Sequence, residues 1–214
     1  MVKKEELLSV LAKRYYHGLY EKILECIGKL YLFGGGVFWR ADIDKKAIAR
    51  GKVDIVNDWL EGKIIIEAGV VLNSDSHRCL TCSIFRAVKL RTHTAGAEII
   101  VRKGSILNGT SIVARSRRIE IGEGTYIAPN CIIMDSDFHD PWPSEGRFTR
   151  TGVENDREVI IGKNVWIGTG CIILKGTVIG DNSIIGAGSV VNSNIPAGCL
   201  AAGVPARVVK IVEE

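Results

Sequence analysis

A six-residue period between Ile161 and Pro196 is the feature that most constrains how this chain can fold. Divided into hexads, the stretch reads IGKNVW, IGTGCI, ILKGTV, IGDNSI, IGAGSV and VNSNIP, and each hexad begins with isoleucine or valine. A fixed internal period indicates a repeat architecture. Six is neither the period of an α-helix nor that of simple strand alternation. It suits a chain that makes one short strand per hexad and then turns a corner.

Three such hexads would close a triangular coil, so that each first-position residue lies on the residue one coil further on. Ile161 is expected under Ile179, and Ile167 under Ile185, at the strand spacing of about 4.8 Å. Glycine in the second position is expected to permit unusual backbone angles at the corner. Small residues in the fifth position fit where the cross-section narrows. The period therefore predicts an all-β fold, a parallel β-helix with triangular coils.

The period is also present upstream, with two interruptions. It is clean from Val101 (VRKGSI, LNGTSI, VARSRR), and two extra residues precede IGEGTY, IAPNCI and IMDSDF. After Phe138 it fails, and it resumes at Ile161. Because a loop thrown out of a regular solenoid is where function tends to be located, we predict a projecting functional loop at about 139–160.

The chain is predicted to have three parts: residues 1–36 form an N-terminal helical segment, 37–63 a transition, and 64–214 the β-helix domain with a C-terminal tail. Apolar residues recur at helical spacing in the first part, at Leu7, Leu8, Leu11, Tyr15, Leu19, Ile23, Ile27 and Leu30. Gly34, Gly35 and Gly36 are expected to end the helix. The segment could be two helices broken near Gly18 or an amphipathic membrane-surface segment, but a cap on an open end of the solenoid is favoured.

Composition and cysteine spacing exclude several classes. The net charge is +4, which does not indicate nucleic acid binding. No apolar run is long enough for a transmembrane span, and the N-terminus lacks the features of a signal peptide, so a cytoplasmic location is expected. Cys79 and Cys82 form a Cys-x-x-Cys without the second pair that zinc requires, and no metal is predicted. Cys131 and Cys171 are expected to be buried apolar residues.

The sequence IGKNVWIGTGCIILKGTVIGDNSIIGAGSVV, followed by IPAGCLAAGVPARVV, resembles the C-terminal half of hexapeptide-repeat acyltransferases. The most similar branch is that of the maltose/galactoside O-acetyltransferases and the polysaccharide O-acetyltransferases related to them. The resemblance covers roughly residues 64–212. It implies a left-handed β-helix, acetyl-CoA as co-substrate, a sugar or glycan acceptor, and a homotrimer with active sites between its subunits.

His139 is the predicted general base. It follows the last regular hexad in MDSDFHDPW, where the resembled family has its catalytic histidine. Transfer of an acyl group to a hydroxyl requires removal of the hydroxyl proton, and histidine titrates near neutral pH. A base also needs an orienting partner, and Asp135 and Asp137 are both candidates. His93 could contact substrate, although a structural role is favoured.

Two further residues are site candidates by resemblance. Asn108 falls where the family has an asparagine on the acceptor or oxyanion side of the site, and a side-chain amide there can stabilise the oxyanion. The alternative is a turn asparagine before Gly109. Trp166 aligns with a tryptophan that the family has beside the site, and the alternative is an outward-facing aromatic on a strand.

The resemblance places the acetyl-CoA arm along the C-terminal coils, and it implies contacts with Gly168, Thr169, Gly186 and Ala187. Arg207 and Lys210 are available to the phosphates, or else they are solvated charges on a tail. The Thr-Lys that the family often has before Ile-Pro is replaced by Asn192 and Ser193. CoA binding would therefore depend more on Arg207 and Lys210.

Three functions compete. The favoured one is a sugar O-acetyltransferase, most similar to the members that act in polysaccharide biosynthesis, with N-acetylation of an amino sugar or acetylation of a drug as variants. A γ-class carbonic anhydrase would need three histidine ligands, and none follows His139 in the sequence. A β-helix scaffold without activity is the non-enzymatic alternative.

Overall fold

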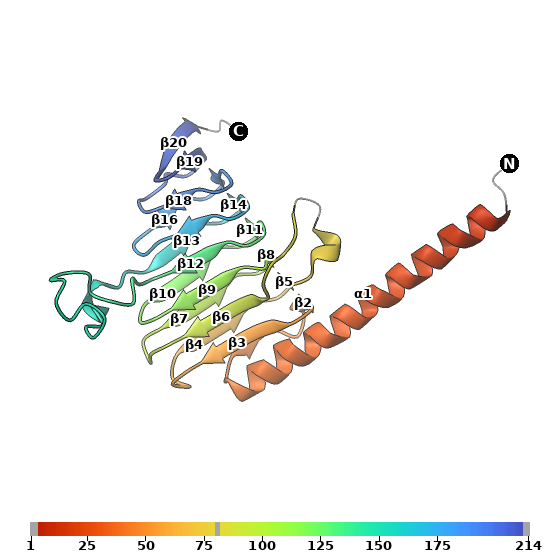
Figure 1. Ribbon diagram of the computed structural model, residues 1–214, viewed down its shortest axis with the longest axis horizontal. Helices are drawn as coiled ribbons and strands as arrows, with labels where there is room; N and C mark the ends of the chain where they lie inside the picture. Colours follow the sequence, from red (N-terminus) through yellow and green to blue (C-terminus); the bar gives the residue numbers. More distant parts are fainter. Residues whose placement is uncertain (1–3, 80–81, 212–214) are drawn as a thin grey trace.

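The computed structural model describes residues 4–79 and 82–211, and it shows a β-helix with a long helix across its N-terminal end (Figure 1). Three parallel sheets form the faces of the β-helix, and one hairpin at the C-terminal end is antiparallel. Each coil contributes one strand to each sheet in turn. The all-β fold with triangular coils is confirmed.

The sheets are named A, B and C here. Sheet A contains β1 (Asp42–Ile43), β4 (Lys63–Ile66), β7 (Glu98–Val101), β10 (Arg118–Ile121), β13 (Val159–Ile161) and β16 (Val178–Ile179). Sheet B contains β2 (Ile48–Arg50), β5 (Val71–Asn73), β8 (Ile106–Asn108), β11 (Tyr126–Ile127), β14 (Trp166–Ile167), β17 (Ile184–Ile185), β19 (Cys199–Gly203) and β20 (Ala206–Ile211). Sheet C contains β3 (Val53–Asn57), β6 (Val88–Thr92), β9 (Ser111–Ala114), β12 (Ile132–Met134), β15 (Ile172–Ile173) and β18 (Val190–Val191).

The register follows the hexad period. Ile161 pairs with Ile179, and Ile167 pairs with Ile185, as predicted. The first-position side chains point inward and are almost completely buried, as are the fifth-position residues, including Cys171. Stacked aliphatic side chains therefore fill the interior of each coil.

The corner glycines act differently from the prediction. The left-handed backbone angles occur at the fourth position of the first five hexads, which is always Gly or Asn: Asn164, Gly170, Gly176, Asn182 and Gly188 have φ between 51° and 75°. The second-position glycines have no such angle. A Cβ on Gly162, Gly168 or Gly180 would instead overlap the backbone of the next coil. Glycine in the second position is needed for close stacking of coils.

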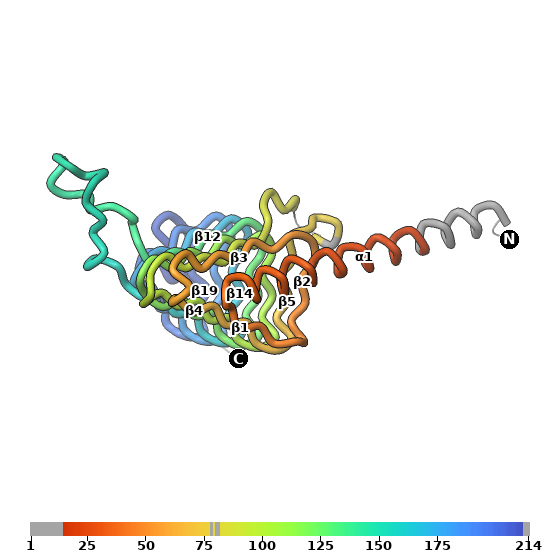
Figure 2. The backbone as a smooth tube through the Cα atoms, turned by 90° about the horizontal axis from the view of Figure 1, so that it is seen from below, coloured from red at the N-terminus to blue at the C-terminus, as the bar shows by residue number. Residues whose placement is uncertain are grey.

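Helix α1 (Lys4–Phe38) is continuous through Gly18 and through the triple glycine, which was expected to end it. The β-helix also begins earlier than the sequence indicated, because β1, β2 and β3 form a coil within residues 37–63. The C-terminal half of α1 packs on β2 and β3 and covers this first coil (Figure 2). Among the described residues, no helix is both long and apolar enough to cross a bilayer.

Two loops leave the coils. Residues 74–87 connect β5 to β6 and include the short 3₁₀ helix η1 (Ser76–Arg78). The Cys79-x-x-Cys82 motif lies in this loop, with its two central residues outside the described part of the chain. Residues 135–158 connect β12 to β13, include η2 (Val153–Asn155), and project from the body on the side away from the free end of α1 (Figures 1 and 2). The predicted projecting loop is confirmed.

Contact between α1 and the first coil depends on Gly28. A Cβ at this position would overlap the carbonyl group of Ala49 in β2, whereas a Cβ on Gly34 would meet nothing within 4 Å. We expect Gly28→Ala to lower the free energy of unfolding by about 1–3 kcal/mol, because the helix must shift away from β2. Gly34→Ala should instead raise it by up to about 1 kcal/mol through helix propensity. Urea unfolding of the two variants compares them, and equal effects would show that Gly28 is not a contact point.

Candidate functional site

His139 lies at the root of the projecting loop, shortly after β12 in sheet C. Its side chain is exposed, and its ring centroid lies 5.9 Å from that of Phe148 in the same loop. The preceding residue, Phe138, has a left-handed backbone with φ of 66°. The chain turns away from the coil here, and the imidazole is accessible to a reactant.

Neither predicted orienting carboxylate is directed to His139. Asp135 is completely buried and accepts hydrogen bonds from the backbone N–H groups of Arg115, Ser116 and Arg117 at 2.7, 2.9 and 2.7 Å. Burial raises the pKa of Asp135, and the three N–H donors offset part of this effect. Asp137 forms an ion pair with Lys175 at 2.6 Å. Both carboxylates therefore have partners other than the predicted base.

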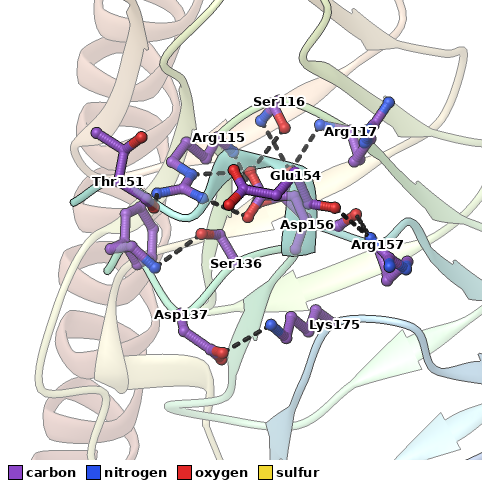
Figure 3. Close-up of polar contacts among 12 residues, drawn as sticks. Arg115, Ser116, Arg117, Ser136, Asp137, Thr151, Glu154, Asp156, Arg157 and Lys175 are labelled. Atoms are coloured by element: carbon purple, nitrogen blue, oxygen red, sulfur yellow. Dashed lines mark hydrogen bonds and ion pairs between the residues drawn. The ribbon is translucent and has the colours of Figure 1, made fainter. Parts of the chain in front are cut away.

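A buried ion pair joins the far end of the loop to the coil below (Figure 3). Arg115 donates from Nε and Nη2 to the two oxygens of Asp156, at 2.8 and 2.6 Å, and from Nη1 to the carbonyl of Thr151. Ser116 Oγ also donates to Asp156, at 2.6 Å. Burial raises the pKa of Asp156, but the hydrogen bonds from Arg115 and Ser116 outweigh it and hold this pKa below its usual range. The pair fixes the stem that follows His139.

His93 lies at the same corner. Its Nδ1 is 2.8 Å from Asp58 Oδ2, and its ring packs edge-on against Phe138 with centroids 5.9 Å apart. Burial, followed by the charge of Arg91, lowers the pKa of His93. His93 therefore has structural partners in the wall beneath the loop.

Loss of the Arg115–Asp156 pair should destabilise the protein in a pH-dependent way. At pH 7, Asp156→Asn is expected to cost about 3 kcal/mol, because it leaves a buried guanidinium without its counter-charge. The folded pKa of Asp156 is lowered, so its contribution is present above the unfolded pKa of about 3.9 and is lost as pH falls through the folded value. The difference between wild type and variant should therefore narrow below about pH 4.

Asp140→Asn is the matched control, since Asp140 pairs with Arg150 in the same loop at 3.3 Å, with both side chains partly exposed. Its removal should cost less than about 1 kcal/mol. Chemical denaturation across pH measures both variants. A cost for Asp156→Asn that does not change with pH would contradict the assignment.

An apolar groove of about 620 Å³ runs along the outer face of sheet B. Tyr126, Trp166 and Ile184 lie in register on β11, β14 and β17 and form its floor. The corner that follows is made of the small residues Gly168, Thr169, Gly186 and Ala187, all of which line the groove with Ala128 and Ile185. The structure therefore brings together Trp166 and the four small residues that the resemblance named.

Arg207 and Lys210 lie on β20, at the C-terminal edge of the same sheet. β20 pairs with β19, which pairs with β17 at the groove. Both side chains are exposed. A charged group emerging from the C-terminal end of the groove along sheet B would reach this edge.

Asn108 is an internal residue. It stacks on Asn73 of the coil below, whose Nδ2 donates to Asn108 Oδ1 at 3.1 Å, and its own Nδ2 donates to the carbonyl of Ile127 at 2.9 Å. Its side chain is almost completely buried. These bonds match the structural role of a corner asparagine, and Gly109 after it has a left-handed φ of 49°.

His139 and the groove belong to different sides of one subunit. His139 follows a strand of sheet C, at the corner that leads to sheet A, whereas the groove lies on sheet B and ends at the corner that leads to sheet C. Figure 1 shows the projecting loop and β14 on opposite sides of the body. A reaction that uses both would need His139 of one copy against the groove of another.

Sequence reasoning missed some residues at both places. Tyr126 in β11 and Ala128 directly after this strand line the groove. The signal that could have found them is the in-register match of IGEGTYIAPN to IGKNVWIGTG across the loop. No sequence signal indicated the Arg115–Asp156 pair, because the position of Asp156 depends on the path of the aperiodic loop.

Comparison with known proteins adds independent findings. The family described as bacterial transferase hexapeptide (six repeats) matches residues 158–193. The galactoside O-acetyltransferase of Escherichia coli (strain K12) is 34% identical over 119 residues, which is 56% of this chain and 57% of that protein. Nodulation protein L of Rhizobium meliloti (strain 1021) is 38% identical over 113 residues, 53% of this chain and 60% of that protein. The chain thus spans less than two thirds of these relatives.

Solved structures agree on the fold. A variant of AntD, an N-acyltransferase from Bacillus cereus in complex with dTDP and coenzyme A, superposes with a TM-score of 0.59 at 19% identity, covering 91% of this chain and 89% of that one. The polySia-specific acetyltransferase NeuO gives a TM-score of 0.55 at 22% identity, covering 81% and 82%. Together with the repeat, these likenesses identify the fold as a left-handed parallel β-helix.

Proposed function

We propose that this chain, whose hexapeptide repeat is similar to that of the galactoside O-acetyltransferases, transfers an acetyl group from acetyl-CoA to a hydroxyl of a sugar or glycan precursor. The observation that carries the proposal is the apolar groove on sheet B, which collects Trp166 and the four small corner residues in one place. The proposal includes a role in polysaccharide biosynthesis. It also places the protein in the cytoplasm.

The groove suits the narrow pantetheine arm of a CoA thioester. Gly168, Thr169, Gly186 and Ala187 give the groove a wall of small residues, and Tyr126, Trp166 and Ile184 supply an apolar floor. At the edge of the sheet, Arg207 and Lys210 are the proposed partners of the phosphates, because cations form charge-assisted hydrogen bonds with phosphate oxygens.

The proposed reaction is a direct transfer. His139 accepts the proton of the acceptor hydroxyl as its oxygen attacks the thioester carbonyl. A tetrahedral oxyanion forms, and a hydrogen-bond donor in the site stabilises it. The carbon–sulfur bond then breaks, and the protonated imidazole returns its proton to the thiolate of CoA.

We propose that the complete site forms between copies in a homotrimer. Within one subunit the groove and His139 lie on different sides of the triangle. A ring of three copies, in which the loop of each one reaches sheet B of the next, would supply both parts at each interface. Such head-to-tail contacts generate closed rings when the rotation closes.

Replacement of the base tests the chemistry. His139→Ala should lower acceptor-dependent release of CoA by about 10²–10⁴-fold, because the hydroxyl proton loses its acceptor. Release is measured with a thiol reagent, using acetyl-CoA and a panel of sugars, amino sugars and glycan precursors. His77→Gln is the control, because His77 is an exposed histidine in the loop of residues 74–87, and this variant should retain wild-type release. Unchanged release by His139→Ala would place the base elsewhere.

Replacement of the groove floor tests the binding mode. Trp166→Ala should raise KM for acetyl-CoA about tenfold with little change in kcat, since a lost apolar contact of this size weakens binding in ground and transition states alike. Trp59→Ala removes another exposed tryptophan, which lies outside the groove, and it should leave KM unchanged. A lower kcat with unchanged KM would contradict the assignment of the groove.

Mixing the two variants tests the shared site. If His139 and the groove come from different copies, unfolding and refolding an equal mixture of His139→Ala and Trp166→Ala should restore intact pairs at about a quarter of the interfaces. At low acetyl-CoA, activity should then exceed that of either variant alone. Activity equal to the mean of the two variants would show that one subunit carries the whole site.

A further inference from the structure

The side of α1 that faces away from the β-helix carries an uncovered apolar stripe. The stripe consists of Tyr16, Leu19, Ile23, Ile27 and Leu30, whose side chains are between 39 and 73% exposed. Steps of three and four residues keep these side chains on one face of the helix. Five large apolar side chains in a row exceed the scattered exposure that is normal for a protein surface.

The opposite side of α1 makes the contact with the body. Glu21, Gly28 and Leu32 are buried there, and Gly28 touches the backbone of β2. At 100° per residue, this contact face and the stripe lie about half a turn apart. The apolar stripe is therefore not the face that stabilises the cap, and the fold does not account for it.

Charge on α1 is distributed unequally between its two sides. Among the side chains described from Tyr15 to Phe38, the acidic ones, Glu21 and Glu25, lie toward the contact face and are buried and half-buried. Lys22 and Lys29 are exposed on one flank of the stripe. On the other flank, Lys52 of the β-helix lies over the ring of Tyr31, with its Nζ 6.0 Å from the ring centroid.

We propose that this stripe is a docking surface for an anionic lipid bilayer, on which α1 lies parallel to the membrane plane. An apolar face flanked by lysines is the pattern of helices that lie in a membrane interface. Exposed tyrosines, here Tyr15 and Tyr16, match the headgroup level, where one end of the ring is apolar and the other is wet.

The charges favour lipid over a second copy of this chain. Two stripes packed together would bring Lys22 and Lys29 of one copy against the same residues of the other, without an exposed acidic side chain between Tyr15 and Phe38 to pair with them. Anionic headgroups supply the opposite charge. The arrangement in space also permits it, because the body lies on one side of α1 and the other side is free (Figures 1 and 2).

The test uses flotation of the full chain with vesicles of phosphatidylcholine and phosphatidylglycerol in equal parts, and with vesicles of phosphatidylcholine alone. We expect binding to the anionic vesicles that weakens with added salt, and much weaker binding to the neutral ones. Ile23→Ser combined with Ile27→Ser should reduce binding to the anionic vesicles about tenfold or more, since the variant lacks two apolar side chains that would be buried in the bilayer.

Two further variants make the result specific. Lys22→Gln combined with Lys29→Gln should lower binding to anionic vesicles and leave the weak binding to neutral ones unchanged. Phe85→Ser removes a side chain that is 77% exposed in the loop of residues 74–87, outside the stripe, and this variant should bind like wild type. Circular dichroism establishes that each variant is folded.

The flotation experiment would overturn the proposal in three ways: no flotation with either vesicle, flotation that the stripe variant does not change, or flotation that Phe85→Ser weakens as much as the stripe variant does. Light scattering of the stripe variant tests the alternative that a second copy of this chain covers the stripe. A lower oligomeric mass would assign the stripe to contact between copies. None of these readouts depends on catalysis, so they distinguish failure of this proposal from failure of the proposed activity.

Discussion

The in-register stacking of one coil on the next is the interaction on which the rest of the structure depends. Each coil hydrogen-bonds to its neighbours through all three faces, and the spacing is close enough that Gly162 and Gly180 have no room for a side chain. Stacking at this distance fixes which side chains lie above one another. Ile161 on Ile179 fills the core by this rule, and Trp166 beside Tyr126 builds the groove floor by the same rule on the outer surface. The same register of the coils therefore places the residues of both the core and the groove.

The β-helix tolerates a large interruption because two irregular segments, the insertion after Ala114 in one coil and the projecting loop of the next coil, supply hydrogen-bond partners to each other. The extra residues after Ala114 leave backbone N–H groups without partners in the sheet, and the carboxylate of Asp135 in the next coil accepts three of them. Arg115, from the same insertion, holds Asp156 at the end of the projecting loop. Buried donors and charges are costly unless they are paired. Here the bulge in one coil supplies the partners that the loop of the next coil needs.

The sequence predicted the structure well where the six-residue period holds and poorly where it does not. The stacking of Ile167 on Ile185 and the groove position of Gly168 follow from the hexads, because identical spacing forces identical placement. The first coil, within residues 37–63, was missed because its short strands carry charged residues and break the hexad pattern. The ion pair of Arg115 and Asp156 depends on the path of an aperiodic loop, for which no local rule exists. Asn108 shows the remaining limit, since a family position does not reveal that its amide is already bonded to Asn73 and Ile127.

The triangular cross-section explains why a proposed site can be divided between copies. The groove on sheet B is open to solvent along the face of the prism, so a site that encloses its reactants needs an appendage or a neighbour to cover it. The loop that carries His139 leaves the corner after sheet C, and the groove occupies sheet B. An arm on one corner and an open face on another are the two halves of a head-to-tail contact, which closes when the rotation between copies matches the symmetry of a ring. The appendages thus divide the roles of the molecule: the loop carries the proposed base, and α1 closes the end of the prism and leaves its outer stripe free for a surface outside the ring.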